Sequence, residues 1–326
     1  MVVSRQESDI QHALGSHSAV YRYPLGIDSV ANQEDISEFI RHRLDQIRAE
    51  NEYLSLDSDW PGGDKISTLT KSAGGLFVWA LTACLYIDGY DPDRKLKELI
   101  TQHSEIKISE PFAQLDKLYK TGMQSAGFWN DSSFRSDCHD ILGAVLCARI
   151  PLSCFVIDSL LDLPPNRACL QSISCLECVL RISETEGIRI LHPWFHDYLS
   201  ERCGGEHWSI NLELHNKELT LRCIQLLDNE LRENICNTTL PYMTGNETVP
   251  KAISYACKFW IEHTCPISDA MDDIVDQIYD FLVKHLLHWM EALALLKCHD
   301  HAIRSIQNLI EWLLVCHPIC IIRTCH

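Results

Sequence analysis

Apolar residues recur at helical spacing along most of this chain, beginning near residue 31. A first amphipathic helix is predicted where one face collects Ile36, Phe39, Ile40, Leu44 and Ile47. Asn32 stands just before that face and is a candidate N-cap, because its side chain can accept a hydrogen bond from an unpaired amide at the helix start.

Three further helices are predicted before residue 103. Trp60-Pro61 marks the start of the second, since proline at the first helical position loses no hydrogen bond. Gly74-Gly75 ends that helix, and residues 76–87, apolar nearly all round, predict a buried third helix. Asp91-Pro92 opens the fourth. The residues expected to face inward from the second and fourth helices are Ile66, Leu69, Ala73, Leu96, Leu99 and Ile100.

The next block has the order of a winged helix-turn-helix. A β-hairpin is predicted from residues 179–183 and 188–191, with a polar turn between them. The helices predicted around it span residues 112–123, 134–146, 153–161, 167–179 and 194–199.

The remainder of the chain is again helical, whereas its beginning is weakly patterned. Residues 1–30 predict extended pieces around a short helix at 7–14. After Gly204-Gly205, helices are predicted over residues 212–231, 251–263, 273–285, 288–296 and 301–315. The predicted fold class is therefore mainly α: a helical bundle, a winged helix-turn-helix with its short β-hairpin, and a second helical domain.

Composition narrows the functional classes. The chain has 326 residues, 46% of them apolar, and a formal charge of −17. Such a surface repels phosphate backbones, and Arg167 is the lone cation of the presumed recognition helix at 166–178, so nucleic-acid binding is not expected. No apolar run reaches the roughly 18 residues of a membrane span, and the polar start after Met1 does not resemble a signal peptide. We expect a cytoplasmic protein.

Sixteen cysteines are interpreted as reduced thiols buried among apolar residues, as at Cys138, Cys223 and Cys257. Cys175 and Cys178 have the spacing of a zinc knuckle, and the residues from Cys316 to His326 could be imagined as a second one. A structural zinc needs four converging ligands, and Cys175 and Cys178 fall inside a predicted helix. No metal is therefore expected.

No catalytic constellation emerges from the sequence. It contains neither a G-x-S-x-G elbow nor an H-E-x-x-H motif, and His285 and His288 are interpreted as surface or interface residues at a predicted helix end. The phosphate-binding motif G-x-x-x-x-G-K-[ST] is also missing from the sequence. We expect neither an enzyme nor a cofactor for this chain alone.

Five segments nevertheless resemble the fungal NACHT-type STAND NTPases, signalling proteins that often carry WD repeats downstream. Their order and spacing also fit that family, and together they extend over nearly the whole chain. The segments are residues 74–83 (GGLFVWALTA), 188–199 (IRILHPWFHDYL), 234–236 (NIC), 255–260 (YACKFW) and 287–293 (LHWMEAL).

The resemblance assigns the blocks. Residues 1–30 would be the C-terminal remnant of the P-loop NTPase core, 31–105 the first helical domain, 106–205 the winged-helix domain and 206–326 the second helical domain. The family's Walker motifs precede the sensor-1 strand, which here corresponds to residues 2–5. We therefore expect either a truncated gene product or a degenerate paralogue.

The resemblance also implies four nucleotide-sensing residues. Arg5 matches the sensor-1 arginine that faces the γ-phosphate, although it could equally be a surface arginine. Gly75 and Phe77 match a turn that lies against the nucleotide, with Phe77 replacing the proline of related proteins. His192 matches a histidine that contacts the β-phosphate in the diphosphate-bound state. Its alternative role is to cap the helix that follows.

Two functions are open at this stage. The first is the regulatory portion of a STAND switch in non-self recognition or programmed cell death, with ATP/ADP or GTP/GDP bound by an intact relative. The second is a free-standing interaction module that binds protein partners, either itself or intact family members.

Overall fold

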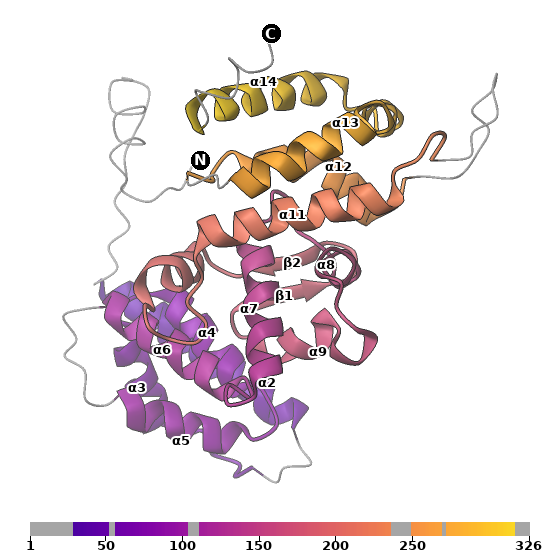
Figure 1. Cartoon of the computed structure of the whole chain (residues 1–326). Helices are drawn as coiled ribbons and strands as arrows, with labels where there is room; N and C mark the ends of the chain where they lie inside the picture. Colours follow the sequence, from indigo (N-terminus) through magenta and orange to yellow (C-terminus); the bar gives the residue numbers. More distant parts are fainter. Residues whose placement is uncertain (1–28, 52–55, 104–110, 236–248, 269–271, 317–326) are drawn as a thin grey trace. The chain divides into compact units, whose positions relative to one another are not determined.

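The computed structural model describes residues 29–51, 56–103, 111–235, 249–268 and 272–316 (Figure 1). These residues are mainly helical and contain one two-stranded hairpin, so the predicted fold class is confirmed. They divide into two compact units. One comprises the described residues up to Leu81 together with those of residues 100–114, and the other comprises residues 82–99 and the described residues from Leu115 onward.

In the first unit, helix α2 (Val30–Glu50) buries the predicted apolar face. The predicted cap is wrong. The Oγ atom of Ser29 accepts a hydrogen bond from the amide of Asn32, so the helix begins one turn earlier and Asn32 lies inside it. The side-chain amide of Asn32 instead donates to the carbonyl of Gly75, at 2.9 Å.

Helix α3 (Gly63–Ala73) packs on α2 and begins later than predicted. Gly62 adopts a φ of 87° as the N-cap, so the helix can start only after it, and Pro61 is left outside in a cis peptide bond with Trp60. The Arg48 guanidinium donates to the carbonyl of Trp60 at 3.1 Å, which fixes this turn to α2.

Three helices, α4, α5 and α6, have residues in both units. Helix α4 (Phe77–Ile87) follows the Gly74-Gly75 break, as predicted. Helix α5 (Pro92–His103) begins at the predicted place, since the Asp91 carboxylate accepts a hydrogen bond from the amide of Arg94. Helix α6 (Pro111–Ser125) follows.

In the second unit, α7 (Ser132–Cys147) and α8 (Cys154–Leu161) match their predictions within two residues. The continuous helix predicted over 167–179 is wrong. The chain forms η2 (Pro165–Arg167), α9 (Cys169–Ile173) and η3 (Ser174–Leu176), because Ala168 is extended and the Asp158 carboxylate caps the amide of Cys169 at 2.7 Å. Cys175 and Cys178 therefore lie outside any α-helix.

The hairpin pairs β1 (Leu180–Ser183) with β2 (Gly187–Ile190), as predicted. The amide of Ile188 donates to the carbonyl of Leu152, which ties the hairpin to the segment before α8. Gly187 has a φ of 78°, and an added Cβ would lie 2.9 Å from that same carbonyl, so the turn requires glycine. Helix α10 (Pro193–Asp197) and the π-helical turn η4 (Tyr198–Arg202) replace the predicted helix 194–199.

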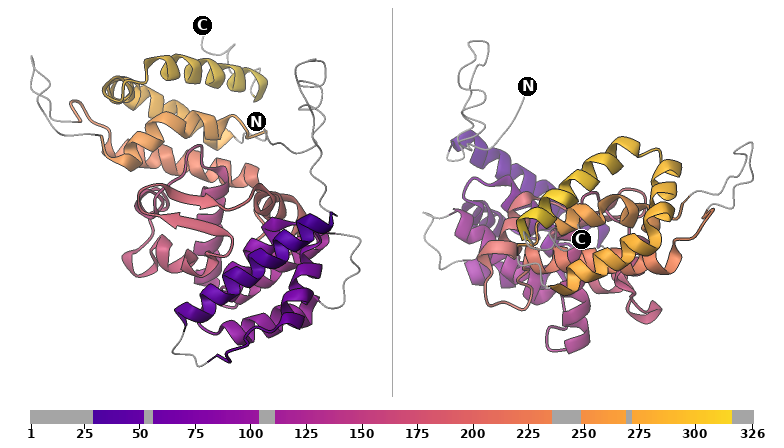
Figure 2. Two further views of the ribbon diagram at one scale, coloured as in Figure 1. Left: turned by 180° about the vertical axis from the view of Figure 1, so that it is seen from behind. Right: turned by 45° about the horizontal axis from the view of Figure 1, so that its top comes forward.

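Four helices complete the second unit: α11 (Leu212–Glu230), α12 (Lys251–Thr264), α13 (Asp272–Leu295) and α14 (His299–Cys316). Helix α12 packs against α11, α13 and α14, and the left view of Figure 2 shows α11, α13 and α14 one above the next. The sequence predicted two helices where α13 is one, with His285 and His288 near its middle. Neither glycine nor proline occurs between residues 285 and 288, so nothing interrupts the backbone ladder.

Aromatic side chains fill the core between α12 and α13. The buried Trp260 ring meets the rings of Phe281 and Trp289 edge to face, both at 5.6 Å. The Trp289 indole also donates to the carbonyl of Cys257 at 2.9 Å. Burial of such rings stabilises the layer through apolar area and quadrupole geometry together.

A buried chain of hydrogen bonds joins α7, α11 and α12. The backbone amide of Arg149, just after α7, donates to the Tyr255 hydroxyl at 3.3 Å, and that hydroxyl lies 2.8 Å from Nε2 of His263. Nδ1 of His263 lies 2.9 Å from Oδ1 of Asn216 on α11, and the Asn216 amide donates to the carbonyl of Leu212. A neutral His263 with its proton on Nδ1 satisfies every donor and acceptor in this chain.

The cysteine interpretation is confirmed for the residues that carried it. Cys138, Cys223 and Cys257 are reduced and at most 1% exposed. Burial raises the pKa of Cys138 and Cys257 to about 12 and raises that of Cys223 as well. These thiols are protonated packing groups.

The buried His263 makes stability sensitive to acid. Burial, aided by the Arg149 charge, lowers its pKa to about 3, whereas an unfolded histidine titrates near 6.5. Between these two pKa values, His263 is therefore protonated in the unfolded state and neutral in the native state. We predict that the free energy of unfolding falls by up to about 1.4 kcal/mol per pH unit from this group, as the pH drops from about 6.5 toward 3.

Urea denaturation from pH 7 to pH 4 measures this slope. His263→Gln should lower the slope of the unfolding free energy against pH by the amount that corresponds to about one bound proton. His207→Gln removes an exposed imidazole and should leave this slope unchanged. Some slope should persist in His263→Gln, because burial also lowers the pKa of His215 to about 4. Equal slopes in the wild type and His263→Gln would contradict the prediction.

Candidate functional site

His192, for which the family resemblance implies a nucleotide-sensing role, is the N-cap of α10. Its Nδ1 atom accepts a hydrogen bond from the amide of Trp194 at 3.2 Å, and its ring meets the Trp194 ring at 5.0 Å. The side chain is half-buried. The capping role that the sequence left open is thus present in the structure, and contact with a phosphate stays a prediction.

Gly75 lies in the turn between α3 and α4, and Phe77 is the first residue of α4. Gly74 and Gly75 have φ angles of 53° and 81°, both in the left-handed region that favours glycine. The Gly75 carbonyl is held by Asn32, and the Phe77 ring packs against Phe39 at 5.9 Å while staying 43% exposed. The turn therefore presents an exposed aromatic ring on a backbone anchored to α2.

The four predicted residues are not all described. Arg5 lies outside the described residues. Gly75 and Phe77 belong to the first unit, whereas His192 belongs to the second unit.

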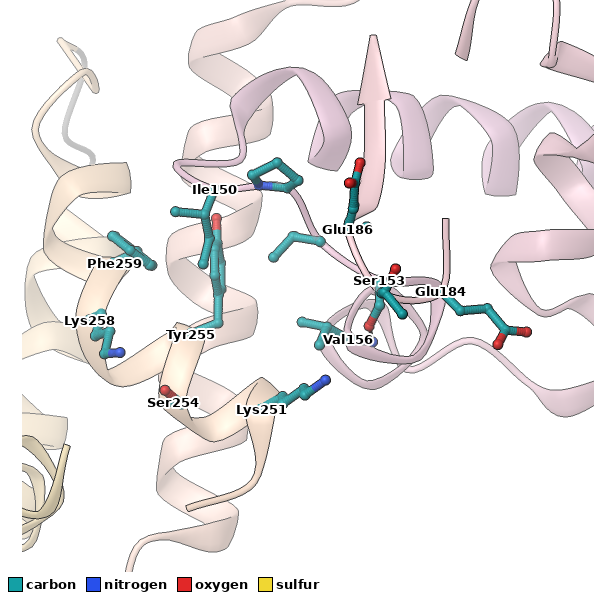
Figure 3. A pocket seen from close by; sticks show the side chains of 14 residues that line it. Ile150, Ser153, Val156, Glu184, Glu186, Lys251, Ser254, Tyr255, Lys258 and Phe259 are labelled. Carbon is teal, nitrogen blue, oxygen red and sulfur yellow. Dashed lines mark hydrogen bonds between the residues drawn. The ribbon is translucent and has the colours of Figure 1, made fainter. Parts of the chain in front are cut away.

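Sequence reasoning missed a pocket of about 190 Å³ in the second unit (Figure 3). The start of α8, the hairpin turn and α12 form its walls. Figure 3 shows the α12 side chains Tyr255 and Phe259 on one side and the glutamates of the hairpin turn on the other. The lining residues are Ile150, Pro151, Leu152, Ser153, Val156, Glu184, Thr185, Glu186, Gly187, Lys251, Ser254, Tyr255, Lys258 and Phe259.

Charged side chains of both signs line this pocket. Two lysines of α12, Lys251 and Lys258, stand against two glutamates of the turn, Glu184 and Glu186, around an apolar floor. Opposite charges around aromatic rings fit a small zwitterionic group or a peptide side chain.

A second feature was also missed. His139 and Asp140 on α7 approach His215 on α11, with one potential ligand atom of each side chain within 4.8 Å of the others. The two imidazole rings lie 4.7 Å apart. Because His215 is about 75 positions from His139 and Asp140 in the sequence, no local motif could have predicted the cluster.

Comparison with known proteins identifies one similarity that spans nearly the whole chain. The chain is 23% identical over 340 residues to the vegetative incompatibility protein HET-E-1 of Podospora anserina. The match takes in 95% of this chain and 24% of the relative, so the chain spans about a quarter of that protein's length. The similarity supports the resemblance to the fungal NACHT-type family.

No known protein-family model matches the chain, and no solved structure matches it either. In the described part, helices with the length and apolarity needed to cross a bilayer are absent.

Gly75 gives a test of the turn. We predict that Gly75→Ala destabilises the first unit by about 1–2 kcal/mol, since an added Cβ disfavours a φ of 81°. Thermal or urea unfolding measures the change.

Gly63→Ala is the matched control. Gly63 is the first residue of α3 and an added Cβ there meets no atom within 4 Å, so this change should be neutral or slightly stabilising. If both alanine variants unfold at the same urea concentration, the turn does not depend on the glycine conformation.

Proposed function

We propose that this chain is the helical regulatory portion of a fungal NACHT-type STAND switch that acts in non-self recognition or programmed cell death signalling. The observation that carries the proposal is the similarity to a vegetative incompatibility protein along 95% of the chain. The winged helix and its flanking helical domains would hold the off state of such a switch, and their release would expose assembly surfaces.

The packing supports this proposal. Two of the segments that resemble the family, 255–260 and 287–293, meet in the core through Trp260 and Trp289. A third, 188–199, buries Phe195 and Leu199. The resembling residues are therefore largely the ones that build the fold, as expected if this chain shares the architecture of its relative.

The chain would act without hydrolysing nucleotides alone. Its sequence holds no P-loop lysine to bind the phosphates, so ATP/ADP or GTP/GDP would be bound by the core of an intact relative. In this proposal the chain works in the cytoplasm, and its partners are proteins.

The test is a fusion of the full chain to the P-loop core of an intact relative. If His192 senses the diphosphate, His192→Ala removes a hydrogen bond to a charged group, worth roughly 1.5–3 kcal/mol. We predict about 10- to 100-fold weaker diphosphate retention. Nucleotide content is measured by chromatography after denaturation, alongside the melting temperature.

His196→Ala, in the same short helix, is the control and should retain the nucleotide. A His192→Ala protein with a lower melting temperature and normal nucleotide content would leave His192 only its capping role, and nucleotide sensing would be withdrawn. A fusion that never retains nucleotide would contradict the regulatory proposal itself.

The second candidate function is a free-standing interaction module, which a specific surface favours. Helix α13 buries one face and exposes a second apolar face on the other side. Leu287 is 79% exposed and Val283 is 70% exposed. The exposed apolar residues of this outer face, at helical spacing, are Tyr279, Val283, Leu286, Leu287 and Met290. Such a stripe is typical of a helix that packs into a groove of a protein partner.

We predict that Leu287→Lys weakens self-association, or binding to an intact relative, by about 2 kcal/mol, roughly 30-fold. Sedimentation velocity over a concentration series measures it. Gln277→Lys adds the same charge at an exposed polar position of α13 and should have no effect. Unaltered association in Leu287→Lys would remove the outer face from the interaction.

A further inference from the structure

The cluster of His139, Asp140 and His215 brings two imidazoles and a carboxylate together where α7 packs on α11. His139 and Gly143 lie one helical turn apart on α7, and the His215 ring lies against both, tilted by 50° to the His139 ring. A Cβ added to Gly143 would lie 2.1 Å from Nδ1 of His215, so the ring rests directly on the α7 backbone. The absence of a side chain at Gly143 is what admits the imidazole.

His215 is buried without a partner for one of its nitrogens. The residue is 5% exposed, and its Nε2 atom makes no hydrogen bond to the described residues. A buried nitrogen left unpaired costs on the order of 1–3 kcal/mol, so native structures normally provide a partner for it.

The second imidazole, His139, is held at one nitrogen and faces the Asp140 carboxylate with the other. Its Nε2 atom lies 3.1 Å from the carbonyl of Ser209, and a carbonyl can only accept, so Nε2 carries the proton. In the neutral ring, Nδ1 then carries the lone pair, and this atom lies 3.8 Å from Oδ1 of Asp140. The potential ligand atoms of His139, Asp140 and His215 thus lie close together, and a cation between them would offset the repulsion between their lone pairs. A carbonyl holding the outer N–H is also the usual support of a metal-bound imidazole.

We propose that His139, Asp140 and His215 bind a divalent transition-metal ion of the zinc class. Two imidazoles and one carboxylate are ligands that Zn²⁺ accepts, and three protein ligands leave a position for water or an external group. The ion would link α7 to α11 and so secure their packing. The inference departs from the expectation of no metal, and it does not rest on the proposed function.

The test uses the full chain and Zn²⁺ alone, followed by isothermal titration calorimetry at neutral pH. The wild type should bind one Zn²⁺ at this site and gain melting temperature. His139→Gln and Asp140→Asn, both at partly exposed positions that tolerate the change, should bind at least about tenfold more weakly. His207→Gln removes a histidine from an exposed turn and should bind as the wild type does.

Because the chain has many thiols, a second measurement identifies the ligands. X-ray absorption at the zinc edge should show nitrogen and oxygen neighbours near 2.0–2.1 Å rather than sulfur near 2.3 Å. Sulfur ligation, equal affinity in His139→Gln and Asp140→Asn, or no binding by the wild type would each overturn the proposal. In the last case, the alternative is a protonated His139 paired with Asp140.

Discussion

The hydrogen-bonded chain from Arg149 through Tyr255 and His263 to Asn216 is the constraint on which the second unit depends. Each link is directional, because a neutral imidazole donates from one nitrogen and accepts at the other. The end of α7, the first turn of α11 and the whole of α12 must therefore meet in one register. The same register places Tyr255 in the wall of the pocket and brings His215 over α7.

Apolar periodicity, together with proline, glycine and polar-turn signals, predicted most of the helices and the hairpin, because the periodicity shows which face of each element is buried. Its failures have local physical causes. The segment 167–179 looked helical, but Asp158, from a different helix, captures the amide of Cys169 and sets a new start. Conversely, the sequence predicted a helix end at His285 and His288. Histidine does not break a helix, and the apolar face of α13 continues past both residues.

The candidate sites were harder to predict than the fold. A glycine pair such as Gly74-Gly75 indicates a turn in the left-handed region of the backbone. The position of His192 before a proline is consistent with a helix N-cap. The pocket and the His139–Asp140–His215 cluster carry no such local signal. Each assembles side chains from segments far apart in the sequence, so they appear only once α7, α11 and α12 are packed.

The buried cysteines have a practical consequence. A protonated thiol with almost no exposed surface cannot react with an alkylating reagent until local unfolding exposes it. Cys138 on α7, Cys223 on α11 and Cys257 on α12 sit on the three helices that the polar chain ties together. The alkylation rate of each of these three cysteines, measured by mass spectrometry, would therefore report how often its own helix separates from its neighbours.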